Sequence, residues 1–234
     1  MLVHERSDTR LAGIDLQAVS VEIDGRPVLS DVDVSLTASR IAVIGANGSG
    51  KSTFARLLNG LVEPTTGRVR VLGLDAVRDR TDLRRRVGFV FTNPDAQILM
   101  PTPAEDLALS LRGRDRREIE TRVARTLAEH GLAGHADMPA SALSGGQKQM
   151  LALASVLITD PELIVADEPT TLLDLHNARR IGDLLLALQA QVVLVTHDLE
   201  LAARCDTAVL FEDGRLADAG DPADHIRTYR RVRA

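Results

Sequence analysis

The sequence has little of several residue types, and each shortage excludes a class of structure. Aromatic residues make up only 2% of the chain, with no tryptophan and a single tyrosine, Tyr229. The core must therefore be built from aliphatic side chains. The one cysteine, Cys205, cannot form a disulfide within the chain. This suits a reducing compartment and predicts an inert filler side chain.

Long apolar runs and a dominant charge are also missing. No uninterrupted apolar stretch approaches the roughly 18 residues that a membrane-spanning helix needs. The N-terminal MLVHERSDTR lacks the apolar centre of a signal peptide. If the protein serves a membrane, other chains must cross it. The net charge of -5 and the shortness of the basic runs at 84–86 and 112–117 argue against a nucleic-acid partner.

What is present is a chain that can bury a core, 44% hydrophobic over 234 residues, which fits one domain or one domain with a lobe. Alternation in VSVEI and VDVSL, around a turn at Asp24-Gly25, predicts antiparallel strands within 14–36. Short apolar runs predict further strands: VRVLG, VGFVF, RIAVI (40–44), LIVAD (163–167) and VVLVT (192–196).

Helical patterns lie between these strands, at 52–59, 118–129, 147–158 and 175–189. The alternation of strands and helices predicts an α/β fold with a mostly parallel sheet. We expect a polar leader at 1–13, then one domain at 14–234. Within it, 14–92 and 156–234 form the core with an N-terminal antiparallel part, and 93–155 form a helical lobe.

A glycine-rich segment follows the strand expected at 40–44 and fits G-x-x-x-x-G-K-[ST] in full. Its glycines let backbone N–H groups converge on phosphates, and the following helix start adds positive charge. Lys51 is expected to neutralise the β- and γ-phosphates, and Ser52 to offer its hydroxyl to Mg²⁺. The sequence therefore predicts ATP and Mg²⁺ as ligands, with the nucleotide bound by Gly45, Ala46, Asn47, Gly48, Ser49, Gly50, Lys51, Ser52 and Thr53.

Two further strand ends complete this chemistry. LIVADE places Asp167 to bind Mg²⁺, through water, and Glu168 to polarise the attacking water. His197 follows VVLVT, where a neutral imidazole can donate a hydrogen bond to the γ-phosphate.

A second glycine-rich segment, LSGGQ at 143–147, opens the helix expected at 147–158 and is only half a phosphate site. No second lysine–serine or carboxylate pair accompanies it. A head-to-tail dimer solves this, because each copy then completes the partner's site around one two-fold axis. The residues expected to act on the partner's nucleotide are Ser144, Gly145, Gly146 and Gln147.

Together these motifs resemble the ATP-binding subunits of ABC transporters, over roughly residues 14–220. The resemblance implies a P-loop ATP hydrolase, with ATP sandwiched between two subunits and a helical lobe that contacts membrane subunits at the cytoplasmic face. It also implies that Glu168 is the catalytic base and His197 the switch histidine. Asp174, in TTLLD, matches the aspartate that lies across the dimer interface. A homodimer is expected, because this chain holds both halves of a site.

The run NPDAQI, followed by PTPAED, resembles the ATPases of energy-coupling factor importers. This implies a groove for the coupling helices of a transmembrane scaffold, and a separate small membrane subunit that binds the substrate. Glu105 and Asp106 suit a helix start and would also suit basic partner residues. TTLLDL and FTNPDAQ together resemble the ATPase of biotin uptake systems. Cobalt, nickel or another vitamin are the alternative cargoes.

Three departures from the family pattern matter. Val21 and Ile23 stand where an aromatic residue usually stacks on adenine, and Leu172 replaces a small residue near the dimer interface. Thr92 follows the FVF strand where a glutamine usually contacts Mg²⁺ and the γ-phosphate. We expect Gln97 to have taken that catalytic and metal-binding task. The alternative is that Gln97 packs within the helical lobe and Thr92 supplies only a hydroxyl.

Two other functions compete with transport. One is a soluble ATPase of the same family that serves an assembly system, such as iron–sulfur cluster assembly. The other is a nucleotide-binding switch without turnover, against which the complete set of catalytic residues argues.

Overall fold

The computed structural model describes residues 13–233, with side chains up to residue 229, so most of the expected leader lies outside the described residues. Its first sheet is antiparallel, in the order β2-β1-β4-β5. The strands are β1 (Ile14–Ile23), β2 (Arg26–Leu36), β4 (Thr66–Val71) and β5 (Leu74–Asp75). Asp24 and Gly25 between β1 and β2 both have left-handed backbones, with φ of 51° and 72°. This is the geometry of a tight hairpin turn, and the predicted hairpin is confirmed.

The second sheet has the order β10-β9-β3-β8-β7-β6. All neighbours are parallel except the edge strand β10, which runs antiparallel to β9. The predicted α/β class, with a mostly parallel sheet and an N-terminal antiparallel sheet, is confirmed. The strands are β3 (Arg40–Gly45), β6 (Val87–Val90), β7 (Leu163–Asp167), β8 (Gln191–Val195), β9 (Thr207–Glu212) and β10 (Arg215–Gly220).

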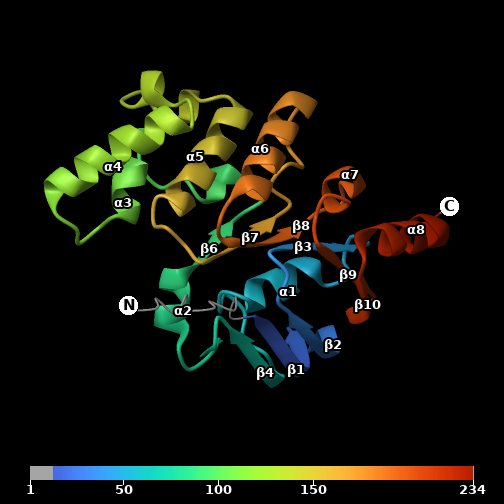
Figure 1. Ribbon diagram of the computed structural model, residues 1–234. Coiled ribbons are helices and arrows are strands. Elements are labelled where there is room, and N and C mark those ends of the chain that lie inside the picture. Colours follow the sequence, from blue (N-terminus) through green and yellow to red (C-terminus); the bar gives the residue numbers. More distant parts are fainter. Residues whose placement is uncertain (1–12, 234) are drawn as a thin grey trace, which may run out of the picture.

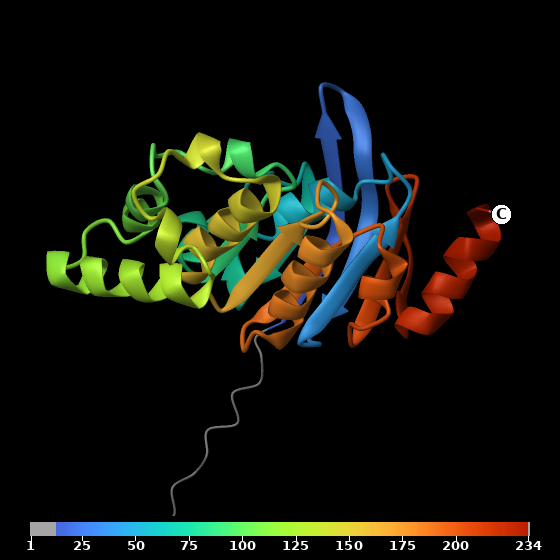
Figure 2. The ribbon, with the colours of Figure 1, turned by 90° about the horizontal axis from the view of Figure 1, so that it is seen from above.

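Helices cover one face of this second sheet, while α1 and the antiparallel sheet lie on the other (Figure 1). From above, α3 and α4 lie at the end of the molecule opposite α8 (Figure 2). The helices are α1 (Lys51–Leu57), α2 (Arg80–Arg86), α3 (Pro103–Ser110), α4 (Arg116–Glu129), α5 (Gly145–Leu157), α6 (Leu175–Ala187), α7 (Leu199–Ala202) and α8 (Pro222–Arg233). Short 3-10 turns occupy Pro94–Ala96, Ala133–His135 and Ala140–Ala142.

The parallel sheet separates two aliphatic cores, because successive residues of a strand point to opposite faces. In β3, Ala42 and Ile44 pack with the helices α3 to α6, while Ile41 and Val43 face α1 and the antiparallel sheet. Cys205 is buried, and burial raises the pKa of its thiol to about 11, which keeps it protonated. The expected aliphatic core and inert cysteine are both present.

The four predicted helices exist, with ends shifted by a few residues where capping decides. The carboxylate of Asp115 accepts hydrogen bonds from the backbone N–H groups of Arg117 and Glu118, so α4 begins before the first periodic residue. Ser144 caps α5 in the same way. No prediction covered β5, β9, β10, α2, α7 and α8.

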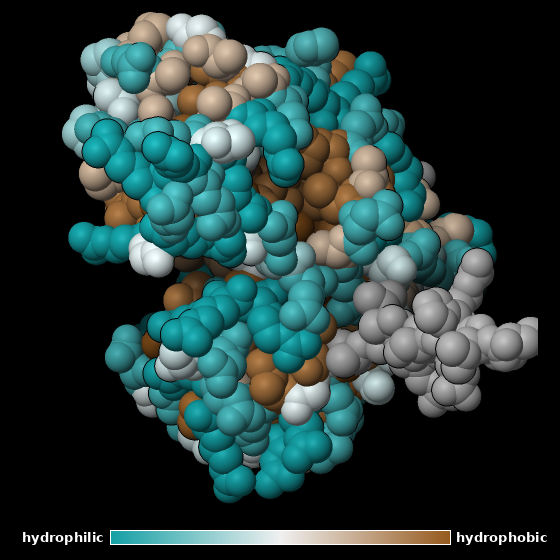
Figure 3. Space-filling view, turned by 60° about the vertical axis from the view of Figure 1, so that its left-hand side comes forward, coloured by the Kyte–Doolittle hydropathy of each residue, from teal (hydrophilic) through white to brown (hydrophobic). Residues whose placement is uncertain are grey.

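Among the described residues, no helix is both long and apolar enough to cross a membrane. Figure 3 shows hydrophilic side chains over much of one face, with apolar side chains gathered in recessed areas.

Candidate active site

The predicted phosphate, carboxylate and histidine motifs meet at one edge of the parallel sheet. The strands β3, β8, β7 and β6 are adjacent and parallel, so their carboxyl ends lie at the same edge. The glycine-rich loop follows β3, His197 follows β8, Glu168 follows β7, and Thr92 follows β6. Sheet order therefore brings together residues that are far apart in the sequence.

The loop between β3 and α1 depends on glycine at two positions. A Cβ at Gly45 would lie 2.2 Å from the carbonyl oxygen of Phe211, and one at Gly50 would lie 2.5 Å from Leu29 Cδ2. Both glycines also have positive φ, 147° and 98°. A side chain at either place would push the loop off the sheet edge, so the loop shape is set by these residues.

The loop encloses a cavity of about 310 Å³, within the range of small-ligand sites. Lys51 is buried there, and its Nζ donates to the carbonyl oxygens of Gly45 (2.8 Å) and Ala46 (2.7 Å). A fixed ammonium beside backbone N–H groups at a helix start is suited to a polyphosphate. The lining residues are Val28, Asn47, Gly48, Gly50, Lys51, Ser52, Thr53 and Glu168.

Ser52 and Asp167 form the pair expected to hold Mg²⁺. The Ser52 hydroxyl donates to Asp167 Oδ1 over 2.9 Å. Burial raises the pKa of the Asp167 carboxyl, and the hydrogen bond from Ser52 opposes that rise. Hard oxygen atoms of this kind fit a divalent cation that also takes phosphate oxygens and water. Among the described residues, no cluster of three or more His, Cys, Asp or Glu side chains could hold a metal without such help.

Glu168 is held in position from three sides. Its backbone has φ of 52°, a left-handed conformation that costs a non-glycine residue roughly 1–2 kcal/mol. Its N–H donates to the Val195 carbonyl oxygen at 2.9 Å. Its Oε2 accepts from the Thr171 hydroxyl at 2.8 Å and lies 2.7 Å from His197 Nδ1. The chain thus fixes a carboxylate at the rim of the phosphate cavity, as a general base requires.

The contact with His197 adds to the sequence prediction. Because a carboxylate accepts, Nδ1 is the donor, so the one N–H of a neutral ring is directed at Glu168 here and not at a phosphate. Thr171 and Val28 were missed by the sequence analysis. Thr171 carries a weak signal, since it stands three residues after Glu168, whereas Val28 looks like any strand residue.

The adenine prediction is half wrong. Val21 is 1% exposed and belongs to the core beneath the antiparallel sheet, because it points to that face of β1. Ile23, at the end of the same strand, is exposed. Val28, which lines the phosphate cavity, is the aliphatic side chain that the structure adds.

Gln97 does not reach the phosphate cavity, contrary to the expectation that it acts in catalysis and metal binding. Its Oε1 accepts from the Phe91 N–H at 3.1 Å, and its Nε2 donates to the Ala152 carbonyl oxygen at 2.9 Å. It therefore joins the end of β6 to the middle of α5. Thr92 instead contacts the end of β7, since its hydroxyl donates to the carbonyl oxygen of Asp167 at 2.8 Å.

This assignment predicts that Gln97→Ala lowers stability rather than catalysis. Loss of the amide leaves the backbone N–H of Phe91 without its partner, which costs about 1–3 kcal/mol of unfolding free energy. Urea denaturation measures it, with the exposed Gln17→Ala as control, expected to change stability by less than about 0.5 kcal/mol. A hydrolysis rate that collapses in Gln97→Ala at unchanged stability would restore Gln97 to the catalytic set.

The second glycine-rich segment forms the start of α5. Ser144 Oγ accepts from the Gln147 N–H at 3.3 Å, while Gln147 Oε1 accepts from the Ser144 N–H at 2.8 Å. This capping box leaves the Ser144 hydroxyl proton free to donate. Neither residue lines the cavity at the first loop, so one chain does not bring its two half-sites together.

Asp174 is tied to this segment through α6. It caps α6 by accepting from the N–H of Asn177 at 2.9 Å, and this bond lowers the pKa of the Asp174 carboxyl. The Asn177 side chain donates to Asp174 at 2.7 Å. A Cβ on Gly146 would lie 2.5 Å from Asn177 Cγ, so a side chain there would displace the Asn177 amide from Asp174. The starts of α5 and α6 thus lie against each other.

A family model described as ABC transporter matches residues 29–171, more than half of the chain. The chain belongs to the ABC transporter family. It is an ATP hydrolase of the ABC type, and the ATP-binding subunit of such a transporter.

Relatives from several organisms cover almost the whole chain. A putative ABC transporter ATP-binding protein of Deinococcus radiodurans is 46% identical over 93% of this chain and 97% of its own length. The biotin transport ATP-binding protein BioM of Rhizobium etli is 43% identical over 94% and 99%. The energy-coupling factor transporter ATP-binding protein EcfA1 of Lactobacillus delbrueckii is 40% identical over 85% and 74%.

Two solved ABC ATPase structures share the fold. CbiO1 of Clostridium perfringens, part of the ABC transporter complex cbiONQ, superposes with a TM-score of 0.82 at 27% identity, over 94% of this chain and 92% of that one. The cassette MJ0796 was solved as a dimer in a post-hydrolysis state with ADP and phosphate. It superposes with a TM-score of 0.76 at 28% identity, over 89% of this chain and 98% of that one.

Proposed function

We propose that this chain powers an energy-coupling factor importer for a micronutrient, with biotin as the cargo. The observation that carries the proposal is the near full-length similarity to BioM, together with the similarity to EcfA1. The segment NPDAQI at 93–98 also supports it, because it resembles the matching segment of energy-coupling factor ATPases. On this proposal the protein lies at the cytoplasmic face of the membrane, bound to a scaffold subunit and a small substrate-binding subunit.

Each nucleotide site is assigned to two copies of the chain. The loop at 45–53 and Lys51 bind the phosphates, and Ile23 and Val28 offer aliphatic contacts to the base. Ser52 and Asp167 hold Mg²⁺, which when bound neutralises phosphate charge and orients the γ-phosphate. Glu168 accepts a proton from the attacking water, and His197 holds the Glu168 carboxylate in place.

The second copy closes the site. Ser144 and the N–H groups of Gly145 and Gly146 contact the γ-phosphate of the partner's nucleotide, with Gln147 holding Ser144 in position. Asp174 lies at the dimer interface beside them. Leu172, which is 66% exposed, then packs between the copies where a small residue is usual. ATP thus holds the two copies together, and hydrolysis of ATP lets them separate.

A groove of about 470 Å³ on the helical part is the proposed contact with the scaffold subunit. It contains Leu99, an apolar side chain that is 73% exposed. The lining residues are Asp95, Ile98, Leu99, Met100, Pro101, Pro139, Ala140 and Ser141. A groove with an exposed apolar side chain of this kind suits a short amphipathic helix of a partner.

The expectation that Glu105 and Asp106 attract a basic partner is half wrong. Asp106 is buried and accepts from the N–H groups of Leu99 and Met100 and from the Ser155 hydroxyl. It therefore shapes the groove from inside the chain. The Glu105 carboxylate accepts a hydrogen bond from the Thr102 hydroxyl at the start of α3.

Leu99→Asp is expected to weaken binding of the purified chain to membranes that contain the scaffold by roughly tenfold or more, the cost of losing an apolar anchor. ATP hydrolysis by the isolated chain should stay within about twofold, because surface changes away from a site are usually near neutral. Vesicle co-sedimentation measures the first effect. Val77→Asp, at another exposed apolar residue, is the control. Equal losses in both variants would remove the groove from the interface.

The importer itself is tested by pull-down of the chain from its native membranes in mild detergent, followed by mass spectrometry. We expect an integral scaffold protein and a small membrane protein, and biotin bound to the latter. Bound cobalt, nickel or another vitamin would correct the cargo. Recovery of soluble partners only would overturn the transport proposal in favour of an assembly ATPase.

A further inference from the structure

The start of α5 holds the residues proposed to contact the partner's γ-phosphate, yet its own sequence favours a helix only weakly. Gly145 and Gly146 are its first two residues, and glycine favours a helix less than any residue except proline. The first turn reads GGQK, without an acidic side chain to match the positive end of the helix dipole. The shape of this turn therefore depends on hydrogen bonds made by side chains.

Gln147 makes two of these hydrogen bonds with the two ends of its amide group. Its Oε1 accepts from the Ser144 N–H at 2.8 Å. This bond fixes which end of the amide is the oxygen, so the amide nitrogen points to the other neighbour. There it lies 2.9 Å from Nε2 of His135. Because an amide NH2 group can only donate, Gln147 is the donor and the histidine nitrogen is the acceptor.

The tautomer of His135 follows from this bond. With Nε2 as the acceptor, the ring proton of the neutral histidine is on Nδ1. Nδ1 is buried and has no hydrogen-bond partner among the described residues. A buried donor without a partner costs free energy, and an apolar side chain would fill the same space without that cost. Packing alone therefore does not account for a histidine at this position, whereas the bond to Gln147 does.

His135 is itself held in place by the backbone around it. It ends the 3-10 turn Ala133–His135, and its N–H donates to the Leu132 carbonyl oxygen at 2.9 Å. The next carbonyl oxygen, that of Ala136, accepts from the Ala104 N–H of α3 at 3.0 Å. The imidazole thus reaches α5 from a turn that is tied to another helix, so it can act as a fixed support for the start of α5.

We propose that His135 is a positioning residue for ATP hydrolysis, which acts through Gln147 and Ser144 on the nucleotide held by the partner copy. This role rests on the function proposed above, because it needs Ser144 at the partner's γ-phosphate. His135 does not line the phosphate cavity of its own chain. Its loss should therefore loosen the capping box and impair the site across the dimer, while the chain's own loop at 45–53 is unaffected.

The first test replaces His135 with leucine and with glutamine and measures ATP hydrolysis. Leucine cannot accept a hydrogen bond, so His135→Leu should lower kcat by roughly three- to tenfold, the contribution of one hydrogen bond. The KM for ATP should stay within about twofold, because the loop at 45–53 is unchanged. In His135→Gln the amide oxygen lies as many bonds from Cβ as Nε2 does, so kcat should return to within about twofold of the wild type.

The matched control is His130→Leu. His130 is also half-buried, but its Nδ1 bonds to the Thr126 carbonyl oxygen within α4, away from the start of α5. This variant should hydrolyse ATP at close to the normal rate. Normal hydrolysis in His135→Leu, or equal losses in the leucine and glutamine variants at position 135, would overturn the proposal.

The second test shows on which copy His135 acts. A several-fold excess of Lys51→Ala, which lacks the lysine of the first loop, is added to a fixed amount of His135→Leu. Most His135→Leu copies then sit in mixed dimers, where their intact first loop meets the intact Ser144 of the Lys51→Ala copy. The rate should rise towards that of the same amount of wild-type chain. The double variant Lys51→Ala/His135→Leu, added as the control, should give no such rise.

An unchanged rate on adding Lys51→Ala would mean that His135 supports its own copy only, and would overturn the proposal. Ser144→Asp then separates the two levels of failure. If Ser144→Asp is inactive, the shared site stands and only the role of His135 is lost. If Ser144→Asp hydrolyses ATP normally, the function proposed for this segment fails, and His135 has no role in the partner's site.

Discussion

Replacing Glu168 with glutamine is expected to lower the rate of ATP hydrolysis by roughly 10²- to 10⁴-fold, the usual contribution of a general base. Glutamine keeps the size of the side chain and its contacts with Thr171 and His197, but its amide cannot accept a proton from water. ATP binding should persist, because Lys51 and the loop at 45–53 are unchanged. The variant should therefore accumulate as an ATP-bound dimer, visible by size-exclusion chromatography with ATP and Mg²⁺.

The matched control is Glu120→Gln, which removes an exposed carboxylate on α4. It should hydrolyse ATP at close to the normal rate and elute as the wild type does. If Glu168→Gln hydrolyses ATP normally, Glu168 is not the base, and the strained backbone at φ of 52° needs another explanation.

The elements that carry this site were predictable because their signals are local. The loop at 45–53 combines its glycines with Lys51 and stands between a strand and a helix, so both its shape and its chemistry follow from adjacent residues. The strand ends at Asp167 and His197 were predictable for the same reason. Parallel strands then bring these ends to one edge, which is a property of the fold class.

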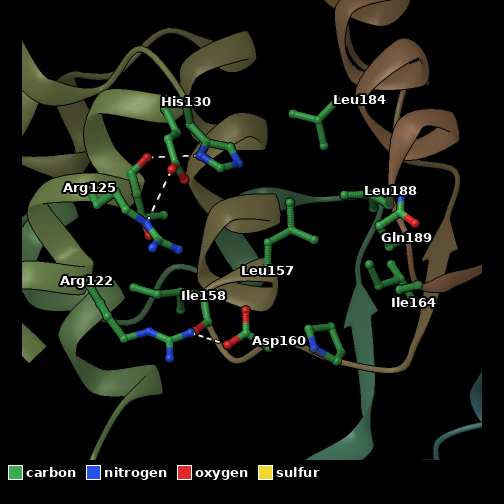
Figure 4. A pocket seen from close by; sticks show the side chains of 14 residues that line it. Arg122, Arg125, His130, Leu157, Ile158, Asp160, Ile164, Leu184, Leu188 and Gln189 are labelled. Carbon is green, nitrogen blue, oxygen red and sulfur yellow. Dashed lines mark hydrogen bonds and ion pairs between the residues drawn. The ribbon is translucent and has the colours of Figure 1, made fainter. Parts of the chain in front are cut away.

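The errors arise where a contact depends on a distant segment. Gln97 was expected at the phosphates because its residue type suits that task, but Phe91 and Ala152 offer it two backbone partners. Val21 was expected at the adenine, yet its place in the strand points it into the core. The cavity of about 500 Å³ between α4 and α6 has no sequence signal at all, since its lining comes from segments far apart in the sequence (Figure 4).

Two inactive variants are expected to restore activity when mixed, and this tests whether each site is shared between two copies. Lys51→Ala removes the lysine of the first loop. Ser144→Asp keeps a good helix cap but places a negative charge where the partner's γ-phosphate is proposed to lie. Each variant alone should lose hydrolysis by roughly 10²-fold or more, because every site in either homodimer lacks one half.

An equal mixture is expected to recover about a quarter of the wild-type rate, because half of the dimers are mixed and each has one intact site. The intact site combines the first loop of the Ser144→Asp copy with the Ser144 of the Lys51→Ala copy. Thr102→Asp is the matched control, since it changes the cap of α3 outside the site and should remain fully active. A mixture no more active than its components would contradict shared sites that work independently. Full activity in Ser144→Asp would remove the second glycine-rich segment from the nucleotide site.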